Sequence, residues 1–378
     1  MRRRILLAVL LAAAAGYLAF GLRIRLARAP RAAAAPGELR GAWHVHTTRS
    51  DGRGTLDEVL RAAREAGLQF VVVADHNVLT PAEQGWHDGV LVVEATESST
   101  RFGHVVAVGV PRPLDAAERD GDPLGAIARL GGEAVLAHPF HPRRPFSGWG
   151  TGPWRGFELV SNDTAWHEVL AERAIGKAAL AAAELPWDGA RAVLALSNDL
   201  SRERARFDAE VAAARGALPG VRPAGRADPA RPPRVLLCSA DAHGYPSYAA
   251  AFEAFSMHVP VAATGDGAED ARRVAAALLD GRAACVFDGV APAASVRLAR
   301  AADPGALELA LRAPDLSRAR FTLLRDGVPV GDAASPVPGG EAVVRLPCGA
   351  GACAPGDYRV EATWDGHPWI FTNPLPID

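Results

Sequence analysis

The sequence predicts an α/β protein: a barrel of alternating strands and helices, a small C-terminal β-sandwich-like domain and an N-terminal membrane anchor helix. Three observations support this fold class. Short apolar runs alternate with helical stretches up to about residue 290, hairpin-type turns punctuate residues 291–378, and an unbroken apolar run lies near the N-terminus. With 378 residues, 49% of them hydrophobic, the chain is long enough to bury the cores of roughly two domains.

The N-terminus indicates an export signal. Arginines at positions 2–4 precede the apolar run 5–22, and further arginines follow it. The run has the length of a short membrane span and exceeds the usual apolar core of a cleaved signal peptide, about 7–15 residues. Proline follows both candidate cleavage sites, at Pro30 and Pro36. We therefore predict a signal anchor over residues 1–27, with a cleaved signal peptide as the alternative, and an Ala/Pro linker over 28–37. The positive-inside rule then places the protein body outside the cytoplasm, anchored in the inner membrane or secreted.

Seven short apolar runs predict buried parallel strands within a barrel domain over residues 38–290. They lie at 41–45, 69–74, 90–95, 105–110, 134–137, 157–160 and 234–240. The clearest helix follows the first run: Thr55 and Glu58 have capping-box spacing, and Gly67 supplies the C-terminal stop. Residues 165–215 are expected to be mostly helical, interrupted at Pro186 and near Ser197, before a loop at 219–233.

Residues 291–378 predict a β-rich domain. Alternating polar and apolar segments are separated by turns at Asp326-Gly327, Pro338-Gly339-Gly340 and Asp365-Gly366, which is hairpin chemistry. The four cysteines fit an oxidising compartment without requiring one. Cys348 and Cys353 are close enough for a local disulfide, with two free thiols as the alternative, whereas Cys238 and Cys285 lie in apolar segments and are expected to be core residues.

Histidines and carboxylates gather at the C-terminal ends of the predicted strands. They are His44, His46, Asp51, His76, Glu94, His104, His138, Asp241 and His243. In a barrel these strand ends converge on one face, where active sites are assembled. Imidazole and carboxylate are the ligands expected for zinc, manganese or iron. Any single one of these residues could be an ordinary core or strand-end residue, but nine on one rim predict a metal site.

The motifs resemble a known superfamily in order and spacing. They are His44-x-His46, Ser50-Asp51-Gly52, Asp75-His76-Asn77, Glu94-x-Thr96, Gly103-His104, Ala137-His138-Pro139 and Asp241-x-His243. This series resembles the PHP (polymerase and histidinol phosphatase) superfamily over roughly residues 39–289. Together with Trp369 and Asn373-Pro374 downstream, it resembles the CehA/McbA-like branch. The resemblance implies a distorted (β/α)7 PHP barrel holding up to three divalent metal ions (Zn, Mn or Fe).

The resemblance also implies a role for each ligand. His44, His46, Glu94 and Asp241 would hold the first metal; Glu94 would bridge to the second, with His104 and His138; Asp51, His76 and His243 would hold the third. The sequence departs from the family pattern at Val93, where related sequences commonly have glycine, so Glu97 competes as a ligand. Its expected position beyond the strand end favours a loop or supporting role. Asp75 is expected to orient a ligand histidine.

The resemblance and the ligand chemistry predict a metal-dependent hydrolase in which a metal-bound water attacks a small phosphate ester. Arg143 and Arg144 are candidates to bind the substrate anion, with a solvated arginine pair as the alternative, and His141 is a candidate acid or base for the leaving group. The net charge of −2 and the absence of a basic stripe argue against nucleic acid and favour a small anionic ester as partner, besides the membrane. A carboxylic or carbamate ester hydrolase remains an alternative, as does a non-catalytic metal-binding envelope protein.

Overall fold

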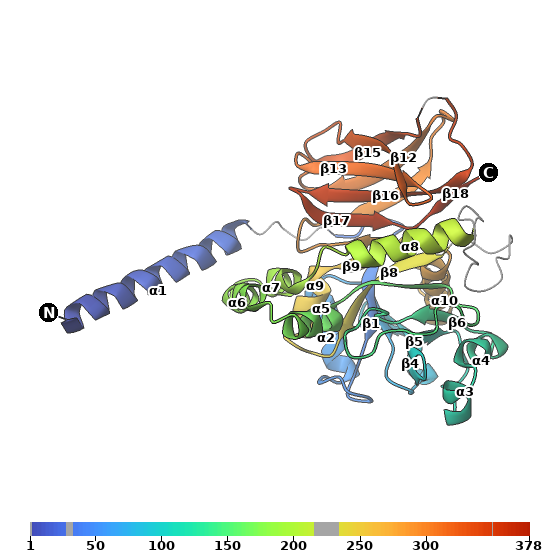
Figure 1. The fold of residues 1–378 in the computed structure, drawn as a ribbon, viewed down its shortest axis with the longest axis horizontal. Helices are drawn as coiled ribbons and strands as arrows, with labels where there is room; N and C mark the ends of the chain where they lie inside the picture. The colour runs from blue at the N-terminus through green and yellow to red at the C-terminus, as the bar shows by residue number, and fades with distance from the viewer. Residues whose placement is uncertain (1, 28–32, 215–233, 350) are drawn as a thin grey trace.

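The computed structural model describes residues 2–27, 33–214, 234–349 and 351–378. Seven strands form a closed barrel, since the last one pairs back with the first (Figure 1). They are β1 (Leu39–Val45), β2 (Phe70–Val73), β4 (Val90–Thr100), β5 (Gly103–Val108), β6 (Glu133–Leu136), β7 (Gly156–Ser161) and β8 (Val235–Ala242). Each of the seven apolar runs falls on one of these strands, so their prediction is confirmed.

The direction of β5 differs from the prediction. β1, β2 and β4 pair in parallel, as do β6, β7, β8 and β1, but β5 is antiparallel to both β4 and β6. Only Arg101 and Phe102 separate β4 from β5. A parallel crossover needs a dozen or more residues, so this short connection requires an antiparallel hairpin.

Two hydrophobic layers hold the barrel wall. Along β2, Phe70 and Val72 belong to the cluster inside the barrel, whereas Val71 and Val73 pack in the outer cluster with residues of α2 (Leu56–Glu65). This alternation is the two-residue period of a strand buried on both faces. Thr55 and Glu58 form the predicted capping box of α2, and Gly67 has the positive φ of a helix stop, 71°.

The remaining elements of the barrel region surround this wall. They are η1 (Pro81–Glu83), β3 (Gly85–His87), α3 (Ala116–Asp120), α4 (Pro123–Arg129), α9 (Tyr248–Ala254), β9 (Ser256–Val259), α10 (Gly267–Leu279) and β10 (Ala284–Val286). Between β7 and β8, the predicted helical segment forms α5 (Asn162–Ala171), α6 (Ile175–Glu184), α7 (Gly189–Leu196) and α8 (Ser201–Ala214). The breaks at Pro186 and Ser197 are as predicted; the loop predicted at 219–233 lies outside the described residues.

The C-terminal region consists of two antiparallel sheets. One contains β13 (Ala319–Arg325), β14 (Val328–Ala334), β16 (Gly356–Trp364), β17 (His367–Thr372) and β18 (Leu375–Ile377); the other contains β11 (Ser295–Arg300), β12 (Ala306–Ala313) and β15 (Gly340–Pro347). Both sheets contribute to one buried cluster, for example through Leu309 and Phe321. The turns at Asp326-Gly327 and Asp365-Gly366 close hairpins, and all four residues have positive φ. Pro338-Gly339-Gly340 instead leads from one sheet to the other.

The sheet is continuous between barrel and C-terminal region. β9 pairs with β1, β10 pairs with β9, and β17 pairs with β10. Cys238 and Cys285 are buried core residues, as predicted, and in addition form a disulfide that connects β8 to β10. The local disulfide between Cys348 and Cys353 is present.

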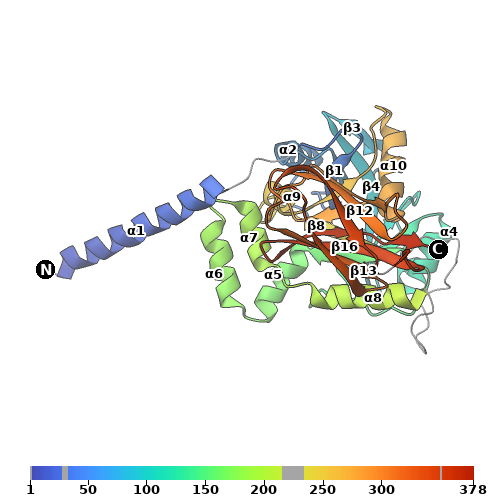
Figure 2. The ribbon, with the colours of Figure 1, turned by 90° about the horizontal axis from the view of Figure 1, so that it is seen from above.

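The N-terminal helix α1 (Arg2–Ala27) extends away from the body in both views (Figures 1 and 2). Its segment Arg3–Leu26 has 24 residues and contains an 18-residue window with a mean hydropathy of 2.4, which makes it long and apolar enough to cross a membrane. Signal sequences near an N-terminus share these properties.

Candidate metal centre

Glu97 lies at the middle of a buried group of histidines. Its Oε1 is 2.9 Å from Nδ1 of His104 and 3.0 Å from Nε2 of His138. Its Oε2 faces three more rings, at 3.2 Å from His44 Nε2, 3.4 Å from His46 Nε2 and 3.0 Å from His76 Nδ1. One fully buried carboxylate therefore contacts five of the six predicted ligand histidines.

The structure corrects the expected position of Glu97 beyond its strand. β4 continues to Thr100, and Glu97 is held in it by backbone hydrogen bonds with Asp75 and Asn77. Glu94 and Glu97 are three residues apart, so they point to opposite faces of β4. Glu97 shares the face of Val93 and Ala95, which line the barrel interior.

Glu94 points away from the histidines. Its Oε2 accepts a hydrogen bond from the backbone N–H of Thr80, and its Oε1 lies 4.0 Å from Arg49. Burial raises the pKa of Glu94 to about 7, although Thr80 and Arg49 act in the opposite direction. Glu97, and not Glu94, therefore lies among the histidines with which the resemblance groups a bridging glutamate.

His44 is oriented by a residue that the sequence analysis missed. Its Nδ1 lies 2.7 Å from Oε1 of Glu158, a carboxylate in the middle of β7 that also accepts from Trp43 Nε1 at 2.8 Å. The other oxygen of Glu158 accepts from the backbone N–H of His138 at 2.7 Å. Glu158 thus fixes both His44 and the end of β6. The sequence did contain a sign of this role, because Glu158 is the single charged residue inside an otherwise apolar strand.

Strained backbone turns side chains into the centre at three strand ends. His44, His138 and Asp241 have φ values of 65°, 27° and 39° at the ends of β1, β6 and β8. Such conformations cost about 1–3 kcal/mol each and persist at functional sites. They explain how neighbours Trp43 and His44 reach the same carboxylate, which an extended strand would not allow.

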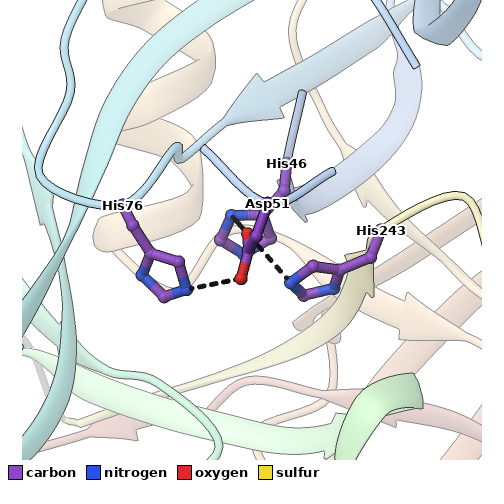
Figure 3. Close-up of side chains that lie close together, drawn as sticks. All are labelled: His46, Asp51, His76 and His243. Atoms are coloured by element: carbon purple, nitrogen blue, oxygen red, sulfur yellow. Dashed lines mark ion pairs between the residues drawn. The ribbon is translucent and has the colours of Figure 1, made fainter. Parts of the chain in front are cut away.

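Asp51 forms a second group with three histidines at the open side of the centre. Figure 3 shows His46, His76 and His243 directed at this carboxylate, from three separate segments of the chain. The nitrogen to oxygen distances are 3.6 Å, 3.4 Å and 3.4 Å, respectively. Asp75 holds the loop that carries Asp51 by accepting from Thr47 N–H and from the Ser50 hydroxyl. We expected Asp75 to orient a histidine; it positions this loop instead.

Asp241 completes the inner side of the centre. Its Oδ1 is 3.3 Å from His46 Nε2 and 3.8 Å from His44 Nε2, while its Oδ2 accepts from the Ser161 hydroxyl at 2.8 Å. The structure therefore brings together eight of the nine predicted ligands, with Glu97 in addition and Glu94 apart.

The donor set fits divalent cations. Because His44 directs its Nδ1 at Glu158, its Nε2 faces Nε2 of His46 only 3.0 Å away, with Glu97 and Asp241 beside them. Acceptor atoms that face one another repel unless a proton or a cation lies between them. Oε2 of Glu97 is also buried without a hydrogen-bond donor. These buried groups of histidines and carboxylates are compatible with divalent metal binding.

The pKa shifts show that the centre attracts positive charge. Burial lowers the pKa of His44, but Glu158, Glu97 and Asp241 outweigh burial and raise it well above its ordinary value. In the same way the pKa of His138 is raised to about 9 by Glu97, and that of His243 to about 9 by Asp51, against the effect of burial. Burial raises the pKa of Glu97, yet the surrounding histidines hold it well below its ordinary value.

Arg144 reaches the centre from an exposed loop. Its Nη1 lies 2.9 Å from Nε2 of His104, the histidine whose other nitrogen faces Glu97. The neighbouring Arg143 contributes its backbone N–H to Nδ1 of His141 instead. Of the two predicted anion-binding arginines, the structure brings the guanidinium of Arg144 to the centre.

His141 belongs to a smaller group with Asp163 and His167. Its Nε2 is 3.3 Å from Oδ2 of Asp163, and Nε2 of His167 is 3.5 Å from the same oxygen. Nδ1 of His141 accepts hydrogen bonds from two backbone amides, those of Arg143 and Arg144. A neutral imidazole that accepts at Nδ1 carries its proton at Nε2. His141 is therefore a hydrogen-bond donor toward Asp163.

Comparison with solved structures gives distant resemblances. A two-domain protein from Bacteroides vulgatus, described as containing a predicted PHP-like metal-dependent phosphoesterase, aligns over 92% of this chain and 99% of its own, at 13% identity and a TM-score of 0.36. A proposed metal-dependent phosphoesterase from Bifidobacterium adolescentis aligns over 35% of this chain and 83% of its own, at 16% identity and a TM-score of 0.23. An amidohydrolase from Chromobacterium violaceum with bound sulfate and no metal aligns over 35% and 84%, at 15% identity and a TM-score of 0.23.

No protein-family model matches the chain, and no curated protein matches it.

Proposed function

We propose that this protein is a metal-dependent hydrolase of the PHP type, in its CehA/McbA-like branch, which hydrolyses a small anionic phosphate ester. One observation carries the proposal: a buried carboxylate, Glu97, contacts five histidines, and an arginine lies on the same group. Imidazole and carboxylate groups that converge inside a protein are the ligand set expected for divalent metal ions.

We propose that the centre takes up to three divalent cations. His44, His46, Glu97 and Asp241 would hold one; Glu97, His104 and His138 a second; Asp51, His76 and His243 a third. Bound cations of this kind lower the pKa of water toward about 7 and neutralise charge on a substrate oxygen. Glu158 keeps His44 Nδ1 protonated, so that the Nε2 lone pair faces the centre.

Two groups outside the ligand set would act on the substrate. Arg144 offers a guanidinium beside His104, where it would pair with nonbridging oxygens of a phosphate. His141 carries a hydrogen at Nε2, three residues after His138, where it would donate a hydrogen bond to the leaving oxygen. The guanidinium favours an anionic ester over a neutral carbamate or carboxylic ester.

We propose that the protein acts outside the cytoplasm, held at the membrane by α1. The apolar helix and the two disulfides support this location. In this arrangement residues 38–290 form the catalytic barrel and residues 291–378 an accessory β domain. The formal net charge of −2 gives no support to a nucleic acid partner.

The experiment is an assay of the full-length chain in detergent with Mn²⁺ or Zn²⁺ added separately. The substrates are p-nitrophenyl phosphate, bis-p-nitrophenyl phosphate and naphthyl carbamate. We expect hydrolysis of a phosphate ester that the double variant His44→Ala, Asp241→Ala abolishes and that His367→Ala, an exposed histidine at the start of β17, leaves unchanged. Turnover of the carbamate alone would mean that the substrate is a carbamate or carboxylic ester and not a phosphate ester. Activity that survives the double variant would overturn the assignment of the site.

A further inference from the structure

The charged side chains of helix α6 face the protein, whereas those of a surface helix in water face the solvent. Its two charged side chains point inward: Glu184 is buried, and Lys177, the only lysine of the sequence, donates to the backbone oxygen of Ser197 at 3.0 Å and to Asn198. Its exposed positions carry no charge: Ile175 is exposed by 78% and Leu180 by 47%, and Gly176, Ala179 and Ala182 are also exposed. A helix in water has the opposite arrangement, with charges outward and apolar residues inward.

The apolar surface extends beyond α6. Leu170 at the end of α5 is exposed by 49%, and Leu185 directly after α6 by 43%. Scattered single leucines on a surface need no explanation, but four large aliphatic side chains exposed within sixteen residues, on and next to a helix whose charges face inward, indicate a surface that is covered. We call Leu170, Ile175, Leu180 and Leu185 the α6 patch.

The N-terminal helix α1 contacts the same helix. The hydroxyl of Tyr17 donates to the backbone oxygen of Ala183 in α6 at 3.1 Å. One turn later, Gly21 lies against the ring of Trp187, and the lack of a side chain at Gly21 is what allows this contact, since a Cβ there would be 2.1 Å from the ring. Ile24, one turn further, is buried. Figures 1 and 2 both show α6 beside the end of α1.

These contacts determine how far α6 is from a membrane that α1 crosses. Tyr17 lies five residues before Leu22, the end of the unbroken apolar run. At 1.5 Å per residue it is about 8 Å inside that end. If the span is in the bilayer, the C-terminal end of α6 is at the level of the lipid headgroups or below.

We propose that the α6 patch lies in the outer interfacial layer of the bilayer, so that α6 acts as a second, in-plane membrane contact beside α1. The proposal rests on the membrane anchorage proposed above. Interfacial helices bury their apolar face about 5–10 Å into the boundary between headgroups and acyl chains, which matches the depth given by Tyr17. The exposed Arg23, Arg25 and Arg173 flank the patch and would reach lipid phosphates.

The consequence is a fixed orientation of the enzyme. Two contacts, one across the membrane and one in its plane, prevent the body from rotating freely relative to the bilayer. The helices α5 to α7 lie between β7 and β8, the strands that carry Glu158 and Asp241, so the membrane contact is adjacent in the chain to the metal centre.

The test uses nitroxide labels on single introduced cysteines in the intact full-length chain, reconstituted in phosphatidylcholine and phosphatidylglycerol vesicles. The four native cysteines are paired in disulfides and do not take the label. The variants are Ala179→Cys on the outward face of α6, Ala13→Cys within α1 and Ala128→Cys, an exposed position on α4. The readout is the accessibility of each label to oxygen, which enters lipid, relative to a water-soluble nickel chelate.

We expect the oxygen-to-nickel ratio at positions 13 and 179 to be several-fold higher than at position 128. A lipid-like ratio at 13 with a water-like ratio at 179 would overturn the α6 contact and leave the anchor intact. A water-like ratio at 13 and 179 would overturn both. Dipolar broadening between labels at 179 would show that a second copy of the chain covers the patch, which also contradicts the proposal.

Discussion

Oε1 of Glu158 lies 2.7 Å from Nδ1 of His44, inside the barrel and out of reach of solvent. This hydrogen bond selects the nitrogen of His44 that faces the centre, and the same carboxylate holds the backbone of His138. A carboxylate that orients a ligand histidine also raises its basicity.

The first prediction concerns that carboxylate. Glu158→Gln keeps the shape of the side chain but removes its charge, so we expect metal affinity to fall by about 10–100-fold. Competition with a chromophoric chelator measures this. Glu172→Gln, an exposed position at the end of α5, is the matched control. An affinity equal to that of the control would mean that the bond between Glu158 and His44 does not support the centre.

The second prediction separates the two adjacent arginines. Arg144→Ala removes the guanidinium beside His104, and we expect kcat/KM for p-nitrophenyl phosphate to fall by about 10–100-fold, or roughly 1.4–2.7 kcal/mol. Arg143→Ala, whose contact to His141 runs through the backbone, should stay near the parent value. Equal losses in both variants would indicate a general effect of surface charge.

The third prediction concerns protons. In the metal-free protein the pKa values of His138 and His243 are about 9, so both rings are protonated at pH 7. A metal ligand must be a neutral imidazole, so metal uptake at pH 7 should release protons, and the number released should decline as the pH passes 9. Calorimetry in buffers of different ionisation enthalpy counts them. Uptake at pH 7 without proton release would contradict these pKa values.

The same shifts affect the stability of the metal-free protein. A histidine whose pKa in the folded state is above its unfolded value of about 6.5 stabilises the fold below that value. This contribution is lost as the pH rises from 6.5 through 9. The thermal midpoint of the metal-free protein should therefore fall over this range.

The fourth prediction ranks the two disulfides. The bond between Cys238 and Cys285 spans 47 residues, whereas that between Cys348 and Cys353 spans 5. By loop-closure entropy, replacing each pair by alanine should cost about 4 kcal/mol and about 2 kcal/mol of unfolding free energy, respectively. Denaturant unfolding measures both. A larger loss from the short loop would mean that loop entropy does not dominate at these sites.

The positions of the strands and most of the centre could be predicted from the sequence because apolar runs and histidines at strand ends are local signals. The C-terminal end of β4 could not be predicted from the sequence. Glu97, Ser98, Ser99 and Thr100 are polar and resemble a loop, yet they pair with β5 as a strand inside the protein. The odd spacing from Glu94 then reverses which glutamate faces the centre.

Other features depend on contacts between distant segments. The positive φ of His44 places it beside Trp43 on Glu158, which lies 114 residues away in the chain. The pairing of Cys238 with Cys285 likewise requires β8 and β10 to lie side by side. No local sequence pattern predicts either of these contacts. The charge of Glu158 inside the otherwise apolar β7 was the one feature that could have indicated its role.

The central claim is that Glu97, and not Glu94, joins the metals, and a comparison of two conservative variants tests it most directly. Both glutamates are buried in β4, so Glu97→Gln and Glu94→Gln are matched in size and strand. We would purify each full-length variant, dialyse it against Zn²⁺ or Mn²⁺ and measure bound metal per chain by mass spectrometry of the ions. Glu97→Gln should lose most of its metal and Glu94→Gln should keep the parent content; the reverse result would contradict the account.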